Sequence, residues 1–165
     1  MNLAERRRAL MVQQGDKLTG NLAVLKHHSN SLNITVNSVD GGYSLTTISY
    51  TGQYAQYGRF ELTTMDITEK LWGKKVQVTA DIASTATGAK PLIRFGYLDP
   101  AYSWKDFRYI GMDNGVCEII YDLPSTRPSN MLASIPLMLF TNVQRNETDP
   151  LNTLTITNVR LEVVE

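Results

Sequence analysis

The sequence predicts an all-β fold, a two-sheet antiparallel β-sandwich (jelly roll) that carries a short N-terminal α-helix. The first residues are good helix formers, with Asn2 as a candidate N-cap and Gly15 as a terminator, and no later segment of comparable length has this character. The rest of the chain alternates apolar and polar residues and is rich in Thr, Val, Ile and Tyr, as half-buried strands are. With 165 residues, 42% of them hydrophobic, the chain can bury one core. We expect a helix and connector over residues 1–28 and one sandwich domain over residues 29–165.

The N-terminal helix has a narrow apolar stripe. Leu3, Leu10 and Met11 stand at i, i+7 and i+8, opposite the arginines at 6–8. An isolated helix of about 13 residues is marginally stable in water, so it needs a surface to lie on, either its own sandwich or another chain. We predict that the segment attaches or oligomerises through Leu3, Arg7, Leu10 and Met11.

Strands are expected along the remaining chain, after a connector that ends at His28. They are predicted at residues 31–39, 43–50, 59–63, 76–82, 91–97, 107–112, 116–121, 135–142 and 154–164. Leu32, Ile34 and Val36 share one face of the first strand, and the sequence Asp40 to Gly42 after it is a strong hairpin turn signal. In the fourth strand, apolar residues from Val76 to Ile82 alternate with polar ones, which is the clearest half-buried strand of the chain.

Two later signals concern strand pairing. Asn114 and Gly115 mark a tight turn, so the strands on either side of it should pair as an antiparallel hairpin. In the last strand the apolar positions change from even to odd numbers across Thr157 and Asn158, which predicts a β-bulge or a crossing between sheets. Between the strands, residues 65–72 should form a helical turn or loop, and residues 123–132 a surface loop.

Composition and charge exclude several classes of protein. Sixteen basic and sixteen acidic residues cancel, whereas a nucleic-acid binder usually has a basic excess. No apolar run is long enough for membrane insertion, and no segment has the form of a signal peptide. Cys117 is the single cysteine, so no intrachain disulfide can form, and we expect it to be a small core residue. Folding in a reducing cytoplasm is consistent with all of this.

No catalytic grouping is recognisable, and we predict that the chain is not an enzyme. The two histidines, His27 and His28, are adjacent in the connector, where we interpret them as solvated linker residues rather than a catalytic base or a metal pair. A glycan hydrolase remains a third possibility, but it would need two facing carboxylates, and no pair is marked by its context.

Aromatic residues give the best candidate ligand site, because sugar rings stack their C–H faces on Trp and Tyr while polar groups bind the hydroxyls. The first candidate set is Tyr97, Asp99, Tyr102 and Trp104, and the second is Tyr54, Tyr57 and Arg59. Asn142, Gln144 and Arg145 lie in another expected loop. The structural alternative is that Tyr97 and Trp104 plug the ends of the sandwich.

Two segments resemble known proteins. Residues 67–84, with a Leu-Trp-Gly-Lys turn before a central strand, and residues 154–164 resemble carbohydrate-binding-module-like (galactose-binding-like) jelly rolls, over about residues 30–165. The opening Leu3–Met11 resembles the N-terminus of structural proteins of phages and prophages of Gram-positive hosts. A structural calcium is common in the jelly-roll superfamily, and Asp40, Asp122 and Asp149 are possible donors, but the chain lacks a clustered calcium pattern and we predict no cofactor.

These resemblances imply a non-enzymatic virion accessory protein, such as a fibre, baseplate or decoration component. It would fold in the host cytoplasm, attach to other virion proteins or form a homo-oligomer, a trimer as the first guess, through its helix, and touch cell-surface glycans with its jelly roll. The alternative is a stand-alone carbohydrate-binding module, whose ligand site is its main purpose.

Overall fold

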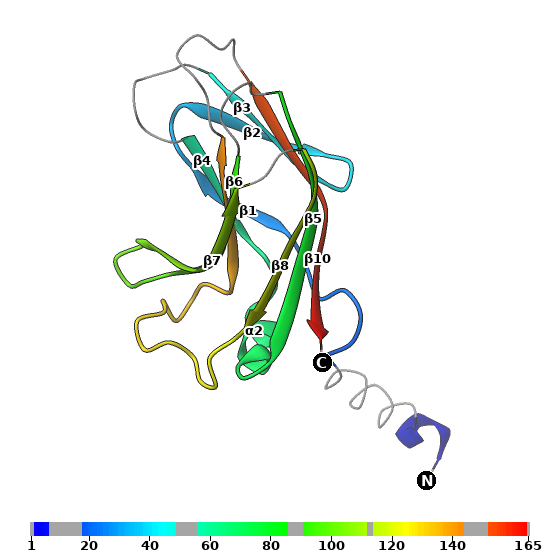
Figure 1. The fold of residues 1–165 in the computed structure, drawn as a ribbon. Coiled ribbons are helices and arrows are strands. Elements are labelled where there is room, and N and C mark those ends of the chain that lie inside the picture. Colours follow the sequence, from blue (N-terminus) through cyan, green and yellow to red (C-terminus); the bar gives the residue numbers. More distant parts are fainter. Residues whose placement is uncertain are drawn as a thin grey trace.

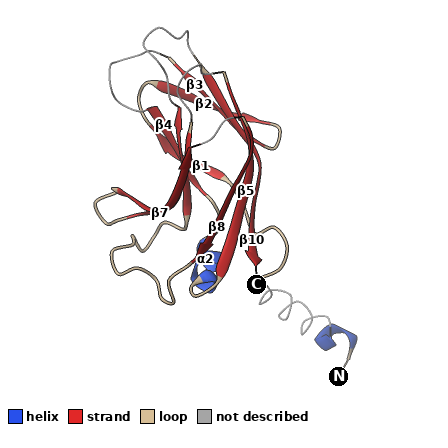
Figure 2. Ribbon diagram, viewed as in Figure 1, coloured by secondary structure: helices blue, strands red, loops and turns tan. Residues whose placement is uncertain are grey.

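The computed structural model describes residues 2–6, 18–48, 56–85, 91–111, 114–143 and 152–164. In these residues the chain forms two five-stranded antiparallel sheets that face each other (Figures 1 and 2). Sheet A has the strand order β1-β4-β9-β6-β7, and sheet B has the order β2-β3-β10-β5-β8. The predicted fold class, an all-β jelly-roll sandwich with a short N-terminal helix, is confirmed.

The strands are 5 to 12 residues long. Sheet A contains β1 (Lys26–Asn30), β4 (Gln56–Glu61), β9 (Met138–Val143), β6 (Leu92–Leu98) and β7 (Trp104–Gly111). Sheet B contains β2 (Ile34–Val39), β3 (Gly42–Thr47), β10 (Thr153–Val164), β5 (Lys75–Ser84) and β8 (Gly115–Asp122). The helix α2 (Met65–Leu71) lies between β4 and β5, and the Thr64 hydroxyl caps it by accepting a hydrogen bond from the Ile67 amide.

The core fills the space between the sheets. In β5, Val76, Val78, Ala80 and Ile82 are buried and alternate with more exposed residues, as predicted. Cys117 on β8 is also buried in the core, as predicted, and burial together with the nearby Glu118 charge raises the pKa of its thiol to about 11. Among the described residues, no helix has the length and apolar character needed to cross a membrane.

Two of the predicted turns are present. The hairpin between β2 and β3 closes from Val39 to Gly42, and Gly41 between them adopts a φ of 78° that suits glycine. The bulge in β10 is confirmed, because its register with β5 shifts between Thr157 and Arg160. Asn158 there has a φ of 52°, and its amide donates to the Gly41 carbonyl.

The hairpin predicted around Asn114 and Gly115 is wrong. β7 pairs with β6 in sheet A, whereas β8 pairs with β5 in sheet B, so the chain crosses between the sheets here. The side chain of Asn114 accepts a hydrogen bond from the Ser84 amide (2.6 Å) and donates one to the Ser84 carbonyl (3.2 Å). Asn114 therefore extends the β5–β8 pairing by one residue before the start of β8, instead of turning the chain back on β7.

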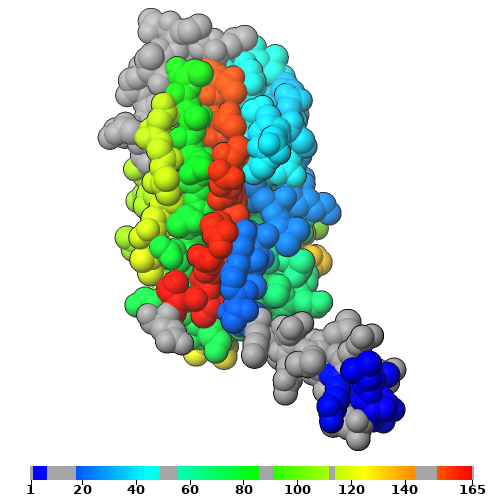
Figure 3. Space-filling model, turned by 90° about the vertical axis from the view of Figure 1, so that its right-hand side faces the viewer, coloured from blue at the N-terminus to red at the C-terminus, as the bar shows by residue number. Residues whose placement is uncertain are grey.

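The connector expected before the first strand is partly strand. β1 begins inside it and pairs with β4, so His27 and His28 are half-buried strand residues and not solvated linker residues. The His27 ring lies 5.7 Å from that of Phe60. The residues before β1 also pack on the sandwich, and the Leu22 amide donates a hydrogen bond to the Leu161 carbonyl of β10. Figure 3 shows this segment beside the lower half of β10. The strand expected at residues 31–39 begins at Ile34, so Leu32 does not share a strand face with Ile34 and Val36 but is 96% exposed in the turn before β2.

The N-terminal helix is described over residues 3–6. Asn2 and Glu5 form a capping box there, each accepting a hydrogen bond from the other's backbone amide, as expected of Asn2 as an N-cap. Leu3 is 64% exposed. Arg7, Leu10 and Met11 lie outside the described residues, so the attachment role of this segment stays a prediction.

Candidate ligand-binding face

Sheet A presents aromatic and charged side chains on its outer face, the face that points away from the core. Strand register places Arg59 of β4, Phe140 of β9, Arg94 of β6 and Tyr109 of β7 in one row across the sheet. Cross-strand partners point to the same face, and Phe60 and Phe95, next to two of them, belong to the core. The row therefore faces outward.

Three rings on this face, those of Tyr57, Phe140 and Trp104, form what we call the aromatic platform. The Phe140 ring stacks on Tyr57 at 4.8 Å between centroids, with 18° between the planes, and lies 5.1 Å from Trp104 in a tilted arrangement. Phe140 is only 4% exposed although it points outward, because its neighbours cover it, whereas Tyr57 and Trp104 are half-buried. The exposed edges of the platform are thus on β4 and β7.

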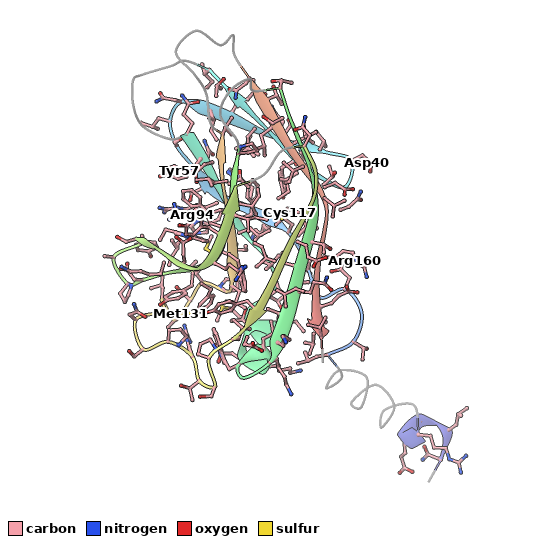
Figure 4. The ribbon with its side chains drawn as sticks, in the orientation of Figure 1. Asp40, Tyr57, Arg94, Cys117, Met131 and Arg160 are labelled. Atoms are coloured by element: carbon pink, nitrogen blue, oxygen red, sulfur yellow. The ribbon has the colours of Figure 1, made fainter. Side chains whose placement is uncertain are left out.

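Two guanidinium groups flank the platform. Arg94 lies with its Cζ 4.9 Å from the centre of the Phe140 ring, and Arg59 lies 5.6 Å from Phe140 and 5.0 Å from Tyr57. Figure 4 shows Tyr57 and Arg94 on the same side of the sandwich, while Arg160 of sheet B lies on the opposite side.

Asp106 holds two of these side chains in place. Its Oδ1 accepts hydrogen bonds from Arg94 Nε (2.9 Å) and Trp104 Nε1 (2.5 Å), and its Oδ2 accepts from Arg94 Nη2 (2.6 Å). Burial raises the pKa of Asp106, but these hydrogen bonds and the Arg94 charge outweigh it, so its pKa lies below the ordinary value. The carboxylate is therefore ionised at neutral pH and fixes the orientation of the Trp104 indole.

Gly96 of β6 lets Trp104 lie close to the sheet. A side chain at this position would collide with the Lys105 carbonyl oxygen and come within 3.1 Å of Trp104 Cζ2. The register of β6 and β7 also shifts between Phe95 and Gly96, which brings Asp106 opposite Gly96. Next to this point, Leu92, Arg94, Asp106 and Tyr109 line an open hollow of about 330 Å³.

The loop between β6 and β7 borders the platform. Asp99 Oδ1 accepts hydrogen bonds from the amides of Ala101 and Ser103, and Tyr102 takes a φ of 60° in the turn that results. The Tyr102 carbonyl accepts a hydrogen bond from Arg59 Nη1 (3.2 Å), and this contact links the loop to β4. The Tyr102 side chain is 58% exposed.

The structure brings together part of the two residue sets that were predicted from the sequence. Trp104, Tyr57 and Arg59 lie on the outer face of sheet A, with Tyr102 at its border. Tyr97 lies in the core and donates to Asn130 Oδ1, which agrees with the alternative that it plugs the sandwich. The Asp99 carboxylate is engaged by its own loop and by Lys105 at 3.8 Å.

Of the remaining residues predicted for the ligand site, Asn142 lies in sheet A and the others lie outside the described residues. Asn142 is buried opposite Tyr57 in the register of sheet A, and its Oδ1 has no hydrogen-bond partner among the described residues. Tyr54, Gln144, Arg145 and Asp149 lie outside the described residues. Within the described ranges, no three His, Cys, Asp or Glu side chains are grouped as metal ligands would be.

Sequence reasoning missed Arg94, Asp106 and Phe140. Alternation in the strand expected at 91–97 already places Arg94 on the outer face of the strand, because Ile93 and Phe95 on either side of it point into the core. Asp106 was missed because the strand was expected to begin at residue 107, whereas β7 begins at Trp104. For Phe140 the available sequence signal is the run Met138-Leu139-Phe140, which does not alternate with polar residues. Such a run indicates a strand that is covered on both faces, and every residue of β9 is buried.

Comparison with known proteins gives similarities in structure only. No protein-family model matches the sequence, and no curated protein matches it as a relative. A structure of the CBM22-1 and GH10 modules of Clostridium thermocellum endo-1,4-β-D-xylanase 10B, complexed with xylohexaose, superposes with a TM-score of 0.54 and 11% identity, over 90% of this chain and 28% of that one. The N-terminal cellulose-binding domain of Cellulomonas fimi β-1,4-glucanase C gives 0.53 and 10%, over 86% of this chain and 89% of that one.

A third structure comes from a phage. The enzymatically active domain of bacteriophage CBA120 tailspike protein 4 has a TM-score of 0.46 and 14% identity, over 87% of this chain and 19% of that one. This similarity is too weak to bear on a virion role. The two similarities above 0.5 show that this chain has the jelly-roll β-sandwich fold of carbohydrate-binding modules.

Proposed function

We propose that this chain is a non-enzymatic glycan-binding module and that its ligand lies on the outer face of sheet A. The observation that carries the proposal is the aromatic platform, with the half-buried rings of Tyr57 and Trp104 on either side of Phe140. Aromatic faces stack on the apolar C–H faces of sugar rings, and the adjacent Arg94 and Asp106 supply groups that can hydrogen-bond hydroxyls.

The fold supports this proposal. The structures that resemble this chain include a cellulose-binding domain and a module pair complexed with xylohexaose. Fold alone does not fix function, so the proposal depends on the chemistry of the platform itself.

Glycan-array binding of the whole chain tests the proposal. Replacement of the ring that forms one end of the platform, Trp104→Ala, should lower affinity for the bound glycan at least about ten-fold, because a stacked ring is lost. Tyr102→Ala, which removes an exposed ring at the border, should lower it less. Val116→Ala removes an exposed apolar side chain from edge strand β8 of sheet B and should leave binding unchanged.

As a control, circular dichroism and thermal unfolding should show that the Trp104→Ala protein is folded like the wild type. Unchanged affinity in a folded Trp104→Ala protein would contradict the proposed site. Absence of binding by the wild-type chain to every glycan on the array would contradict the proposed function itself.

We also propose that the leading segment attaches the module to a larger assembly, as a virion accessory protein would require. Exposed Leu3 on the first helical turn supports this proposal. Sedimentation of the intact chain should show an oligomer, and a chain that lacks residues 1–17 should be monomeric. If both are monomers, self-association through this segment is wrong.

A further inference from the structure

Two positively charged arginines flank the aromatic platform, and only one of them is paired with a carboxylate among the described residues. Arg94 and Arg59 lie on either side of Phe140 in the same cross-strand row. Arg94 shares two parallel hydrogen bonds with the Asp106 carboxylate, so its charge is compensated in place.

Arg59 has no such partner among the described residues. Its Nη1 donates to a neutral acceptor, the Tyr102 carbonyl, and its Nε is buried without a hydrogen-bond partner in the described part of the chain. Glu61 is the acidic residue two positions along the same face of β4, but it stands opposite Lys26 of β1 in the register, and no described carboxylate pairs with Arg59.

Contacts with the rings hold the Arg59 guanidinium in a defined position. Its Cζ lies 5.0 Å from the centre of the Tyr57 ring, and Nη1 is tied to the loop between β6 and β7. The side chain is half-buried, so part of it faces solvent. A guanidinium fixed in this way loses little conformational entropy when it binds a planar anion through two hydrogen bonds.

We infer that the platform selects an acidic glycan, one whose hexuronate units place a carboxylate on Arg59 while the sugar ring stacks on the adjacent aromatic side chains. The inference rests on the proposed function and adds the chemical class of the ligand. A neutral glycan would leave the Arg59 charge uncompensated, and bringing a ligand against it would remove water from the guanidinium without replacing that water by a partner.

The test compares one polysaccharide in two forms. A hexuronate-containing polysaccharide that the chain binds on an array, and the same polysaccharide after chemical reduction of its carboxyl groups to alcohols, are titrated into the whole chain by calorimetry. The wild-type chain should bind the acidic form at least about ten-fold more tightly, as expected of a charge-assisted bidentate contact. This preference should shrink between about 20 mM and about 300 mM NaCl, because salt screens exposed charges.

Variants assign the effect to one residue. Arg59→Gln should lose about ten-fold in affinity for the acidic form and little for the reduced form. Arg160→Gln removes the same charge from the outer face of sheet B and should bind both forms like the wild type. The comparison of the two polysaccharide forms with wild-type protein needs no variant, so it decides whether the chain selects an acidic glycan even if Arg59→Gln does not fold. A folded Arg59→Gln protein that keeps the full preference would show that Arg59 does not bind the carboxylate.

Three further outcomes would overturn the inference. Equal affinity for the acidic and reduced forms would do so and leave the proposed glycan-binding function standing. Binding of sulfated neutral glycans in preference to hexuronates would show that the selected group is not a carboxylate. No binding to any acidic or neutral glycan would overturn the proposed function and this inference together.

Discussion

The outer faces of the two sheets differ in what they expose. Apart from Ala83 and Val164, the outward positions of the central strands β5 and β10 of sheet B hold polar or charged side chains. The hydroxyls of Thr46 and Thr153 lie 3.1 Å apart across β3 and β10. On sheet A, Met138 and Phe140 of β9 point outward but are buried under neighbouring side chains. Sheet A thus has a second apolar layer on its outer face.

This difference indicates where the fold is specialised. Short polar β-branched residues such as Thr are common on strand faces that are exposed to solvent, and the outer face of sheet B is of this ordinary kind. The rings and the two arginines on the outer face of sheet A lie outside the core between the sheets, where they form a second packed layer around Phe140. The proposed ligand site would give this layer a role in addition to its contribution to stability.

Removal of the Phe140 ring, at the centre of the outer layer of sheet A, is the strongest test of the difference between the two sheets. Phe140→Ala should lower the free energy of unfolding by about 3–5 kcal/mol, as for a ring in a core, because Phe140 is 4% exposed and contacts rings on both sides. Thr155→Ala on the outer face of sheet B should cost about 1 kcal/mol or less. Urea denaturation measures both. If the two costs are equal, sheet A has no second layer.

Much of the fold follows from the sequence because alternation is clear wherever one strand face meets water. Val76 to Ile82 in β5 and the even-to-odd change at Asn158 in β10 could both be located, since a face change requires an extra residue. The sheet to which β8 belongs could not be predicted, because a turn signal such as Asn114–Gly115 does not say whether the chain returns to the same sheet. The pairing of β8 with β5, a strand distant in sequence, decides it, and the Asn114 hydrogen bonds to Ser84 extend this pairing.

The candidate site was predictable only in part. Trp104, Tyr57 and Arg59 were found from residue type, because rings and guanidiniums are the groups that such a site needs. Their assembly around Phe140 depends on the register of four strands and on the shift beside Gly96. These long-range pairings leave no local mark in the sequence.

Gly96→Ala should disturb the outer layer of sheet A and cause the next largest loss of unfolding free energy. The new methyl group would collide with the Lys105 carbonyl, which is backbone and cannot move without breaking the β6–β7 pairing, so we expect a loss of about 2–3 kcal/mol in unfolding free energy. The tryptophan fluorescence maximum, to which Trp72 and Trp104 both contribute, should also shift as the Trp104 indole leaves the sheet. Gly111→Ala is the matched control, since its methyl group would meet only Leu92 Cδ2 at 3.4 Å. Equal effects of the two variants would contradict the role of Gly96.

Asn114→Ala tests the chain crossing that separates the two sheets. Loss of its two hydrogen bonds to Ser84 should cost about 1 kcal/mol and speed hydrogen exchange at the Ser84 amide, measured by NMR. Asn114→Asp keeps the acceptor for that amide, so it should retain most of the protection. If exchange at Ser84 is unchanged in Asn114→Ala, the side chain does not hold the end of the β5–β8 pair.

The smallest effect should come from Asp106→Asn, which removes the charge that orients Arg94 and Trp104. Because the pKa of Asp106 is lowered in the folded chain, its carboxylate stabilises the fold at pH values above its ordinary pKa of about 4, and this contribution is lost as the pH falls through the lowered value. Solvent screens the pair, so we expect a difference of about 0.5 kcal/mol from wild type at pH 7, shrinking below about pH 4. Denaturation across this pH range measures it. In an Arg94→Gln background the pH dependence of the difference should be much weaker, and if it is unchanged there, the Arg94 contact is not what lowers the pKa of Asp106.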